Sequence, residues 1–332
     1  MTTLAINQIL IGDSAAMVRL RDLVARLAPA RVPVLIQGPS GVGKELVARA
    51  LHLASGRRGR FVPFNVAAIP ETMLEDALFG HVRGAFSGAV GALSGYLAEA
   101  DGGTVLLDEI GAMGLEVQAK LLRAVELREF RAVGAHSDRA SDFRLVAATN
   151  AVVGDLIASG RFREDLAYRV SGTVINVPAL GERREDIPKL ARHFASELSR
   201  ATSRGVDLSS GACAVLTAHE WDGNVRQLRS IVEAAAALAH AGTVDASAVR
   251  EAISLAALLR PPRAREAERR QLRELLESVN WHTARAAREL GVHRITVNRR
   301  MRALGIEAPD PVRAGARRIS TTCDGAAAAS PA

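Results

Sequence analysis

Gly38-Pro39-Ser40-Gly41-Val42-Gly43-Lys44-Glu45 is the stretch that decides the fold of this chain. It follows the apolar run 34–36 and precedes the periodic run 46–51, so its context is strand, glycine-rich loop and helix. Glycines let backbone N–H groups turn inward, and a helix N-terminus adds positive potential, so such a loop can hold a triphosphate. The sequence therefore predicts a nucleoside-triphosphate site on this loop.

Lys44 strengthens this interpretation, because it is one of three lysines in a chain with 43 Lys and Arg residues. Lys is a compact point charge that fits inside a ring of N–H donors, whereas Arg presents a rigid fork. We expect Lys44 to reach the β- and γ-phosphates; the alternative is a glycine turn with a solvated lysine. Glu45 stands where Ser or Thr would place a hydroxyl on Mg²⁺.

The composition is that of a soluble globular protein, with 48% hydrophobic and 24% charged residues in 332 positions. This length suggests two or three domains. No apolar run approaches the ~18 residues of a membrane span, and the N-terminus lacks the features of an export signal. Cys213 and Cys323 give neither a metal-binding spacing nor a disulfide framework, which fits a reducing cytoplasm.

The net charge of +7 is concentrated in one segment. Residues 1–259 carry 28 basic and 28 acidic side chains, whereas residues 260–302 carry 12 arginines and 5 acidic residues. Residues 303–332 are again neutral, with 3 of each. The partner of segment 260–302 is therefore expected to be a polyanion.

Three predicted strands, at 61–65, 104–109 and 143–150, end in polar residues. Ligands of open parallel sheets lie beyond the carboxyl ends of the strands, so these residues should lie beside the phosphate loop. Asp108 suits Mg²⁺ or its waters, and Glu109 suits polarising an attacking water. Thr149 and Asn150 could sense the γ-phosphate, or they could form a simple strand-end turn.

Helical patterns surround these strands. Ser14 is a candidate N-cap for a helix that contains Met17, Leu20, Val24 and Leu27. After a last strand at 173–178, a small α-domain is predicted, in which Arg226 could face the nucleotide. The helices predicted from periodicity span 71–79, 115–127, 187–201, 211–219, 224–240 and 246–259.

Two further segments have both a functional and an ordinary interpretation. Phe86 is the lone aromatic in the loop 80–89, among glycines and small residues. An exposed aromatic on such a loop indicates contact with a partner, but the ring could also pack into its own domain. Arg163 and Arg169 flank acidic residues, so they form either a salt-bridged surface helix or arginine fingers for a neighbouring subunit.

The C-terminal segment has helix-turn-helix spacing. After a linker at Arg260–Arg263, three helices are expected at 265–279, 283–290 and 294–304, with 291–293 as the turn between the last two. Val297, Met301 and Leu304 recur at helical spacing and should face a core, and the tail 314–332 should be disordered. An arginine-bearing face suits the major groove of DNA, although a charged surface helix is the alternative. The residues expected to contact DNA are Arg294, Thr296, Asn298, Arg299, Arg300 and Arg302.

Together these motifs resemble the bacterial enhancer-binding proteins, the AAA+ activators of sigma-54 RNA polymerase, over roughly residues 11–306. The loop Gly84-Ala85-Phe86-Ser87-Gly88-Ala89 is similar to the GAFTGA signature of that family, and Glu45 is typical of its phosphate loop. Asp108-Glu109 resembles the second nucleotide motif, and the C-terminal unit resembles a Fis-type helix-turn-helix. Further matches are Asn65, which would hold the catalytic glutamate; Thr149 and Asn150, the first sensor; Arg163 and Arg169, the arginine fingers; and Arg226, the second sensor.

The resemblance implies an α/β AAA+ P-loop NTPase, with a parallel sheet flanked by helices, a small α-helical lid domain and a three-helix DNA-binding domain. It implies ATP and Mg²⁺ as cofactors and a ring, expected to be a hexamer. The implied partners are double-stranded DNA and the sigma-54 polymerase, and the implied location is the cytoplasm. Glu109, Asn65, Arg163 and Arg169 would be catalytic, and the Phe86 loop would contact the sigma factor. The domains would span 1–177, 178–255, 267–306 and a disordered 307–332, with a linker at 256–266.

The resemblance also bears on regulation, on the Phe86 loop and on the DNA sequence that is bound. The chain resembles family members without an N-terminal receiver domain, which are controlled by an inhibitor acting in trans or by their own synthesis. Ser87 replaces the usual Thr, while Ile295 and Asn298 replace residues that are often Arg and Tyr, so the operator could differ. The alternatives to a sigma-54 activator are a DNA-binding regulator or repressor whose ATPase is not coupled to sigma-54, and a general AAA+ remodeller of proteins.

Overall fold

The computed structural model describes residues 2–239, 242–258, 262–290, 292 and 294–306. The chain forms two compact units, residues 1–253 and 254–332. Three sequence-based predictions fall wholly or partly outside the described residues: the tail 307–332, the middle of the linker at 259–261, and residues 291 and 293 of the helix-turn-helix turn. No helix in the described part of the chain is both long and apolar enough to cross a membrane.

The first unit is built on a parallel sheet of five strands, as the sequence predicts. The strand order across this sheet is β2-β5-β8-β1-β9, and every neighbouring pair is parallel. The phosphate loop follows β1, an inner strand between β8 and β9, so it lies at the carboxyl edge of the sheet. The strands are β1 (Val34–Gln37), β2 (Phe61–Asn65), β5 (Thr104–Asp108), β8 (Arg144–Thr149) and β9 (Thr173–Asn176).

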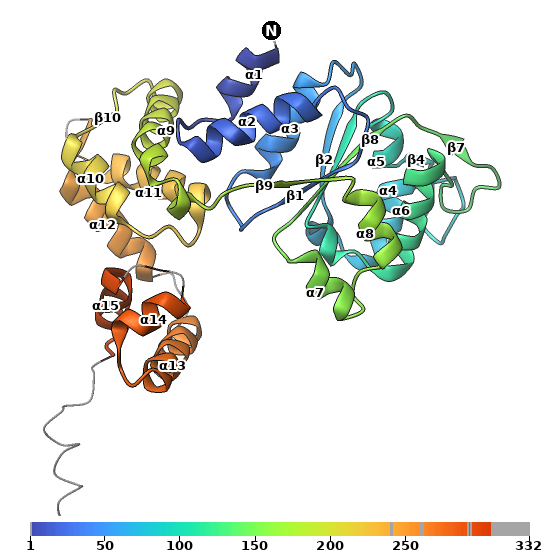
Figure 1. Cartoon of the computed structure of the whole chain (residues 1–332). Coiled ribbons are helices and arrows are strands. Elements are labelled where there is room, and N and C mark those ends of the chain that lie inside the picture. The colour runs from blue at the N-terminus through green and yellow to red at the C-terminus, as the bar shows by residue number, and fades with distance from the viewer. Residues whose placement is uncertain (1, 240–241, 259–261, 291, 293, 307–332) are drawn as a thin grey trace, which may run out of the picture. The chain divides into compact units, whose positions relative to one another are not determined.

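Helices cover both faces of the sheet (Figure 1). Successive strand residues point to opposite faces, so Leu35 packs in one apolar cluster while Val34 and Ile36 pack in the other. Burial on both faces explains why the inner strands β1, β5 and β8 are largely apolar, whereas the edge strands β2 and β9 are only partly buried. One cluster includes residues of α4 (Glu71–Phe79), α5 (Tyr96–Glu99), α6 (Leu115–Leu127), α7 (Val153–Ala158) and α8 (Glu164–Val170); the other includes residues of α1 (Thr2–Ile9), α2 (Ala15–Leu27) and α3 (Lys44–Ala54).

The predicted N-cap of α2 is confirmed, because the Ser14 side chain accepts a hydrogen bond from the N–H of Met17. Ser14 also donates to Asp186 from its hydroxyl at 2.6 Å and from its backbone at 2.8 Å. Asp186 is only 1% exposed, so this contact fixes the start of α2 to the segment that leads into the lid. A further helix, α1, precedes α2 and buries Ile6, although the sequence pattern does not predict it.

Four helices form the lid, whose predicted existence is confirmed. A two-stranded parallel ribbon of β10 (Asp207–Leu208) and β11 (Thr243–Val244) joins the segments that precede α10 and α12. Both α10 and α11 pack against α9. The lid helices are α9 (Ile187–Thr202), α10 (Ser210–Ala218), α11 (Asn224–Leu238) and α12 (Ala246–Leu258).

Two antiparallel ribbons that were not predicted from the sequence flank the Phe86 loop. β3 (Gly80–His81) pairs with β4 (Leu93–Ser94), and β6 (Glu129–Phe130) pairs with β7 (Arg139–Ala140). The N–H of Val82 donates to the carbonyl of Val133, and the N–H of Val133 donates to that of Gly80. The segment that connects β6 and β7 therefore holds the base of the loop through backbone hydrogen bonds.

The second unit contains α13 (Pro262–Ser278), α14 (Thr283–Glu289) and α15 (Arg294–Ala303) around a small core. Val297 is fully buried in this core and Met301 and Leu304 pack against it, which confirms their predicted orientation. One prediction is wrong: Pro262 begins a helix, although it was placed in a linker that spans 256–266. Proline is compatible with the first turn of a helix, where its missing N–H would have no partner within the helix.

Candidate nucleotide site and partner-binding loop

The phosphate loop turns sharply between β1 and α3. Gly43 precedes α3 with a φ of 102°, and Gly41 has a φ of 79°. A Cβ atom on Gly41 would lie 2.4 Å from the carbonyl oxygen of Gly223, a residue of the lid. Gly41 is therefore required both by its backbone conformation and by the close approach of the lid.

Lys44 is the first residue of α3, and its side chain is only 7% exposed. Its Nζ donates to the carbonyl of Gly38 at 3.1 Å and lies 3.6 Å from a carboxylate oxygen of Glu109. The predicted lysine and the predicted acid are thus brought together at the mouth of the loop. Glu45, next to Lys44, pairs instead with Arg49 on the exposed side of α3.

The two carboxylates at the end of β5 are held differently. Asp108 Oδ1 accepts a hydrogen bond from the N–H of Glu109 at 3.0 Å, which orients the Asp108 carboxylate. Glu109 has a φ of 54°, a conformation that costs a non-glycine residue about 1–3 kcal/mol. Its Oε2 accepts from the N–H of Asn150 at 3.3 Å. The strained backbone directs Glu109 toward the phosphate loop and the end of β8.

Asn65 and Thr149 lie at the same edge, as predicted. Asn65 is opposite Asp108 in the register of β2 and β5, and Thr149 is opposite Gln37 in that of β8 and β1. However, the side chain of Asn65 accepts from the N–H of Ala67 at 2.9 Å. Among the described residues, the partners of Glu109 are Lys44 and Asn150, so the expected contact between Asn65 and Glu109 is not made in this conformation.

The lid closes the site from the other side through Arg226, the predicted second sensor. Arg226 Nη1 donates to the hydroxyl of Ser40 at 3.2 Å, and its backbone N–H donates to the carbonyl of Gly41 at 3.2 Å. A cavity of about 610 Å³ lies here, lined by the phosphate loop from Ser40 to Glu45, Asp108, Glu109 and Arg226. Residues separated by almost 190 positions in sequence therefore share one cavity.

Sequence reasoning missed Arg183, which also lines this cavity and is only 2% exposed. Its guanidinium donates to the carbonyl of Val42 at 3.2 Å and to the sulfur of Met17 at 2.8 Å. Burial lowers the pKa of Arg183, and the nearby Asp186 carboxylate opposes that shift. No local pattern distinguishes Arg183 from its neighbour Arg184, because only the tertiary contact with the phosphate loop sets it apart.

Arg163 and Arg169 do not line the cavity of their own chain. Arg163 precedes α8 and makes two bonds to Asp165, of 2.7 and 3.0 Å, on the exposed surface. These bonds raise the pKa of Arg163 and lower that of Asp165. Arg169 is in the last turn of α8 and borders a separate hollow with Arg31 and Arg128.

The loop from Gly84 to Ala89 is closed on itself. The N–H of Gly84 donates to the carbonyl of Ala89, and the N–H of Ala89 donates to the carbonyl of Phe86. Phe86 is 49% exposed, and its ring meets the ring of His81 edge-on with 5.1 Å between centroids. The loop thus presents an aromatic ring to solvent, as the functional interpretation expects, rather than burying it in its own domain.

Helix α15 presents a charged surface opposite its buried side. Arg294, Arg299 and Arg302 are exposed, whereas Thr296, Asn298 and Arg300 are half-buried. Arg294 donates to the hydroxyl of Thr283 at 3.1 Å, which ties α15 to α14. Ile295 is 70% exposed in the first turn of α15, so an apolar side chain lies among these charged ones. Ile295 is not among the residues predicted to contact DNA.

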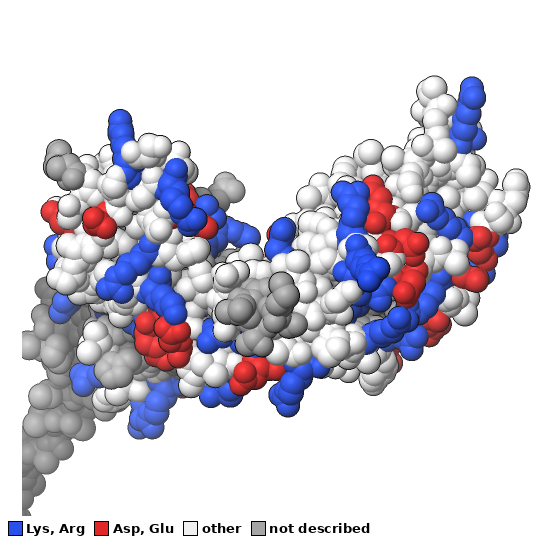
Figure 2. Space-filling view, turned by 90° about the horizontal axis from the view of Figure 1, so that it is seen from above, with Lys and Arg blue, Asp and Glu red and all other residues white. Residues whose placement is uncertain are grey.

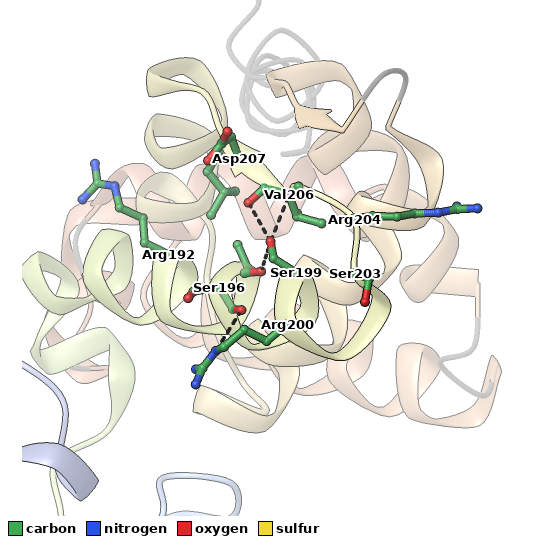
Figure 3. A pocket seen from close by; sticks show the side chains of 11 residues that line it. Arg192, Ser196, Ser199, Arg200, Ser203, Arg204, Val206 and Asp207 are labelled. Atoms are coloured by element: carbon green, nitrogen blue, oxygen red, sulfur yellow. Dashed lines mark hydrogen bonds between the residues drawn. The ribbon is translucent and has the colours of Figure 1, made fainter.

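A second hollow of about 490 Å³ lies in the lid, beside α9. Its arginines, Arg192, Arg200 and Arg204, point away from one another (Figure 3), so they do not converge on a ligand.

On the face in Figure 2, acidic and basic side chains alternate over the surface of the sheet domain. The described part of the chain also contains no group of three or more His, Cys, Asp or Glu able to hold a metal by itself.

Comparison with known proteins agrees with this architecture. Residues 10–176 match the Sigma-54 interaction domain, residues 181–265 the AAA+ ATPase lid domain, and residues 263–304 the Bacterial regulatory protein, Fis family. The chain belongs to the sigma-54 interaction domain family, and carries the lid and the Fis-type helix-turn-helix that accompany it here.

Two curated relatives from Azotobacter vinelandii illustrate the match. The chain is 44% identical to the nitrogen fixation protein VnfA, over 71% of this chain and 45% of VnfA. It is 39% identical to the Nif-specific regulatory protein, over 90% of this chain and 59% of that protein. The chain therefore spans about half the length of these relatives.

A solved structure shows the same fold. NtrX from Brucella abortus, in complex with ATP, superposes with a TM-score of 0.66 at 37% identity. The match covers 89% of this chain and 69% of the NtrX chain.

Proposed function

We propose that this protein is an ATP-hydrolysing transcriptional activator that remodels the sigma-54 RNA polymerase. The observation that carries the proposal is the exposed Phe86 ring in the same folding unit as the cavity around Lys44. Family membership supports both parts, because the domain that spans residues 10–176 is the sigma-54 interaction domain. Nucleotide hydrolysis would then supply the energy, and the Phe86 loop would deliver it.

The nucleotide site suits ATP and Mg²⁺. Lys44 would bind the β- and γ-phosphates, and the ATP complex of the related NtrX supports ATP as the nucleotide. Mg²⁺ typically takes one or two protein carboxylates together with phosphates and waters, which fits the oriented Asp108 carboxylate. When bound, the ion would neutralise charge on the phosphates. Glu109 would orient and polarise the attacking water.

The chain is expected to work as a ring, with a hexamer as the proposed form. Arg163 directly precedes α8 and Arg169 lies in its last turn, both away from the cavity of their own chain. An exposed guanidinium can neutralise transition-state charge only at a site that it reaches, so we assign both arginines to the nucleotide of an adjacent subunit. Thr149 and Asn150 would report the γ-phosphate from within the subunit.

The second unit would bind double-stranded DNA upstream of a promoter. The whole net charge of +7 is carried by residues 260–302, and the exposed arginines of α15 lie opposite its apolar side. Such a helix suits the major groove. A protein that binds DNA through this unit would concentrate the ATPase near the polymerase.

The alternative is a DNA-binding regulator whose ATPase is not coupled to sigma-54, and one experiment separates the two. We expect Phe86→Ala to retain ATP hydrolysis but to lose open-complex formation at a sigma-54 promoter. Met73→Ala is the matched control, because Met73 is also an exposed apolar side chain, at 58%, but lies on α4. Wild-type promoter opening by Phe86→Ala would refute the coupling, as would a wild-type protein that opens no promoter with ATP.

A further inference from the structure

Asn224, the first residue of α11, joins three segments that are far apart in the sequence. Its Nδ2 donates to the carbonyl of Ser40 at 3.0 Å, and its Oδ1 accepts from the N–H of Leu180 at 2.8 Å. Ser40 belongs to the phosphate loop, and Leu180 belongs to the connection between β9 and the lid. One amide group therefore links the lid, the connection and the loop.

The surroundings of Asn224 hold it in an unusual conformation. Its φ is 51°, in the left-handed region that non-glycine residues adopt at a cost, and its side chain is only 3% exposed. Its N–H donates to the carbonyl of Trp221 at 2.9 Å. Strain of this kind persists where the contacts around a residue fix it, and it is common at functional sites.

Asn224 and Arg226 contact the same residue of the phosphate loop. Asn224 binds the backbone carbonyl of Ser40, whereas Arg226 binds its hydroxyl at 3.2 Å. Only Val225 separates the two in sequence, so the backbone position of Asn224 determines the position of the Arg226 Cα atom, from which its side chain extends. A shift of the first turn of α11 would displace both contacts at once.

We propose that Asn224 is a positioning residue for ATP hydrolysis, which fixes the first turn of α11 against the phosphate loop and so places Arg226 at the phosphates. This inference rests on the proposed ATPase activity. Asn224 acts through Ser40 and Arg226, and through Leu180 it makes the placement depend on the connection between the sheet domain and the lid. Loss of the amide should therefore change both nucleotide affinity and turnover.

Two variants of the full chain separate the hydrogen bonds from the backbone conformation. Asn224→Gly accepts the left-handed φ but loses the side-chain bonds to Ser40 and Leu180, together with a longer one to the carbonyl of Asp222. Asn224→Asp keeps an acceptor for Leu180 but sets a carboxylate against the carbonyl of Ser40. We expect kcat for ATP to fall at least about tenfold in Asn224→Gly, because buried hydrogen bonds to both Ser40 and Leu180 are lost, and at least as far in Asn224→Asp. The Kd for ADP, measured by calorimetry, should rise in both.

Asn280→Gly is the matched control, because Asn280 has the same φ of 51° but lies in the second unit. It should leave kcat and the Kd for ADP unchanged. A double-mutant cycle with Arg226→Ala measures the coupling between the two residues in kcat. A purely structural role of Asn224 would give no such coupling. Since Asn224 acts through Arg226, the combined variant should be little worse than Arg226→Ala alone.

Two results would overturn the inference: wild-type kcat and ADP affinity in Asn224→Gly, or full additivity with Arg226→Ala. A purely structural role would give a lower Tm with an unchanged kcat per folded molecule. If the wild-type chain itself hydrolysed no ATP, the proposed function would fail. The ADP affinities of the variants would still decide whether Asn224 shapes the nucleotide site.

Discussion

The ammonium group of Lys44 lies 3.6 Å from a carboxylate oxygen of Glu109, although the two residues come from different elements of the sheet domain. The same ammonium group donates to the carbonyl of Gly38, and the other Glu109 oxygen accepts from the N–H of Asn150. Triphosphate oxygens at the loop would compete with Glu109 for Lys44. Nucleotide binding would therefore release the carboxylate toward the attacking water.

Replacing Glu109 with Gln should abolish turnover while sparing binding. The amide keeps the shape of the side chain but loses the charge that polarises water, so we expect kcat to fall by about 10²–10⁴-fold. The affinity for ATP, measured by calorimetry, should stay within a few-fold of wild type. Glu45→Gln is the control, since Glu45 pairs with Arg49 on the surface. Near-normal hydrolysis by Glu109→Gln would remove Glu109 from the catalytic role.

Arg163→Ala should reduce hydrolysis much more than nucleotide binding, because the side chain lies outside the cavity of its own chain. Arg161→Ala, an exposed neighbour, is the control. Mixing Arg163→Ala subunits with Glu109→Gln subunits should restore part of the ATPase activity, since some interfaces then combine an intact Glu109 with an intact Arg163. Wild-type hydrolysis by Arg163→Ala would return this arginine to a surface ion pair with Asp165.

Ser87→Thr should retain open-complex formation at or above the wild-type rate, with unchanged ATP hydrolysis. Ser87 is exposed in the loop, so the extra methyl group meets no packed neighbour and adds apolar surface for a partner. Promoter opening measured alongside ATPase activity tests this. A Ser87→Thr protein that hydrolyses ATP but opens no promoter would show that this loop is adapted to the smaller side chain.

Stability should fall on mild acidification partly because of His52. Burial, aided by Arg57, Arg144 and Arg49, lowers the pKa of His52 below its ordinary value of about 6.5. The unfolded chain then binds a proton below about pH 6.5 that the folded chain takes up only at lower pH, so stability is lost as pH falls through this window. Chemical denaturation at pH 7 and pH 5 should show a smaller loss for His52→Gln than for wild type. Equal losses would exclude His52 as a contributor.

Arg299→Ala should weaken DNA binding. Arg299 is exposed on α15, opposite the buried Val297 side. If it contacts a phosphate, the slope of log K against log salt should fall by about one; if it contacts a base, affinity should fall selectively for the preferred operator. Arg273→Ala on α13, where Arg273 pairs with Glu277, is the control. Unchanged affinity and slope would place Arg299 outside the interface.

The parts of the fold set by local patterns were predictable. Strand ends at Asn65, Asp108 and Thr149 share one edge because parallel strands align their carboxyl ends, and the registers agree with this. Side-chain contacts between distant segments were not predictable: Arg183 and Asn224 reach the phosphate loop only through the tertiary fold. The start of α13 at Pro262 was missed because proline can end a helix or begin one.

Each folding unit carries one of the two tryptophans of the chain, Trp221 and Trp281. Trp221 is buried just before the first turn of α11, with its indole N–H bonded to Leu216 and its ring 4.8 Å from that of His219. Trp281 packs against the core of the three C-terminal helices. Replacing Trp281 with Phe would therefore leave Trp221 as the single tryptophan, beside the lid turn, and its selectively excited emission would report motion there without any attached dye.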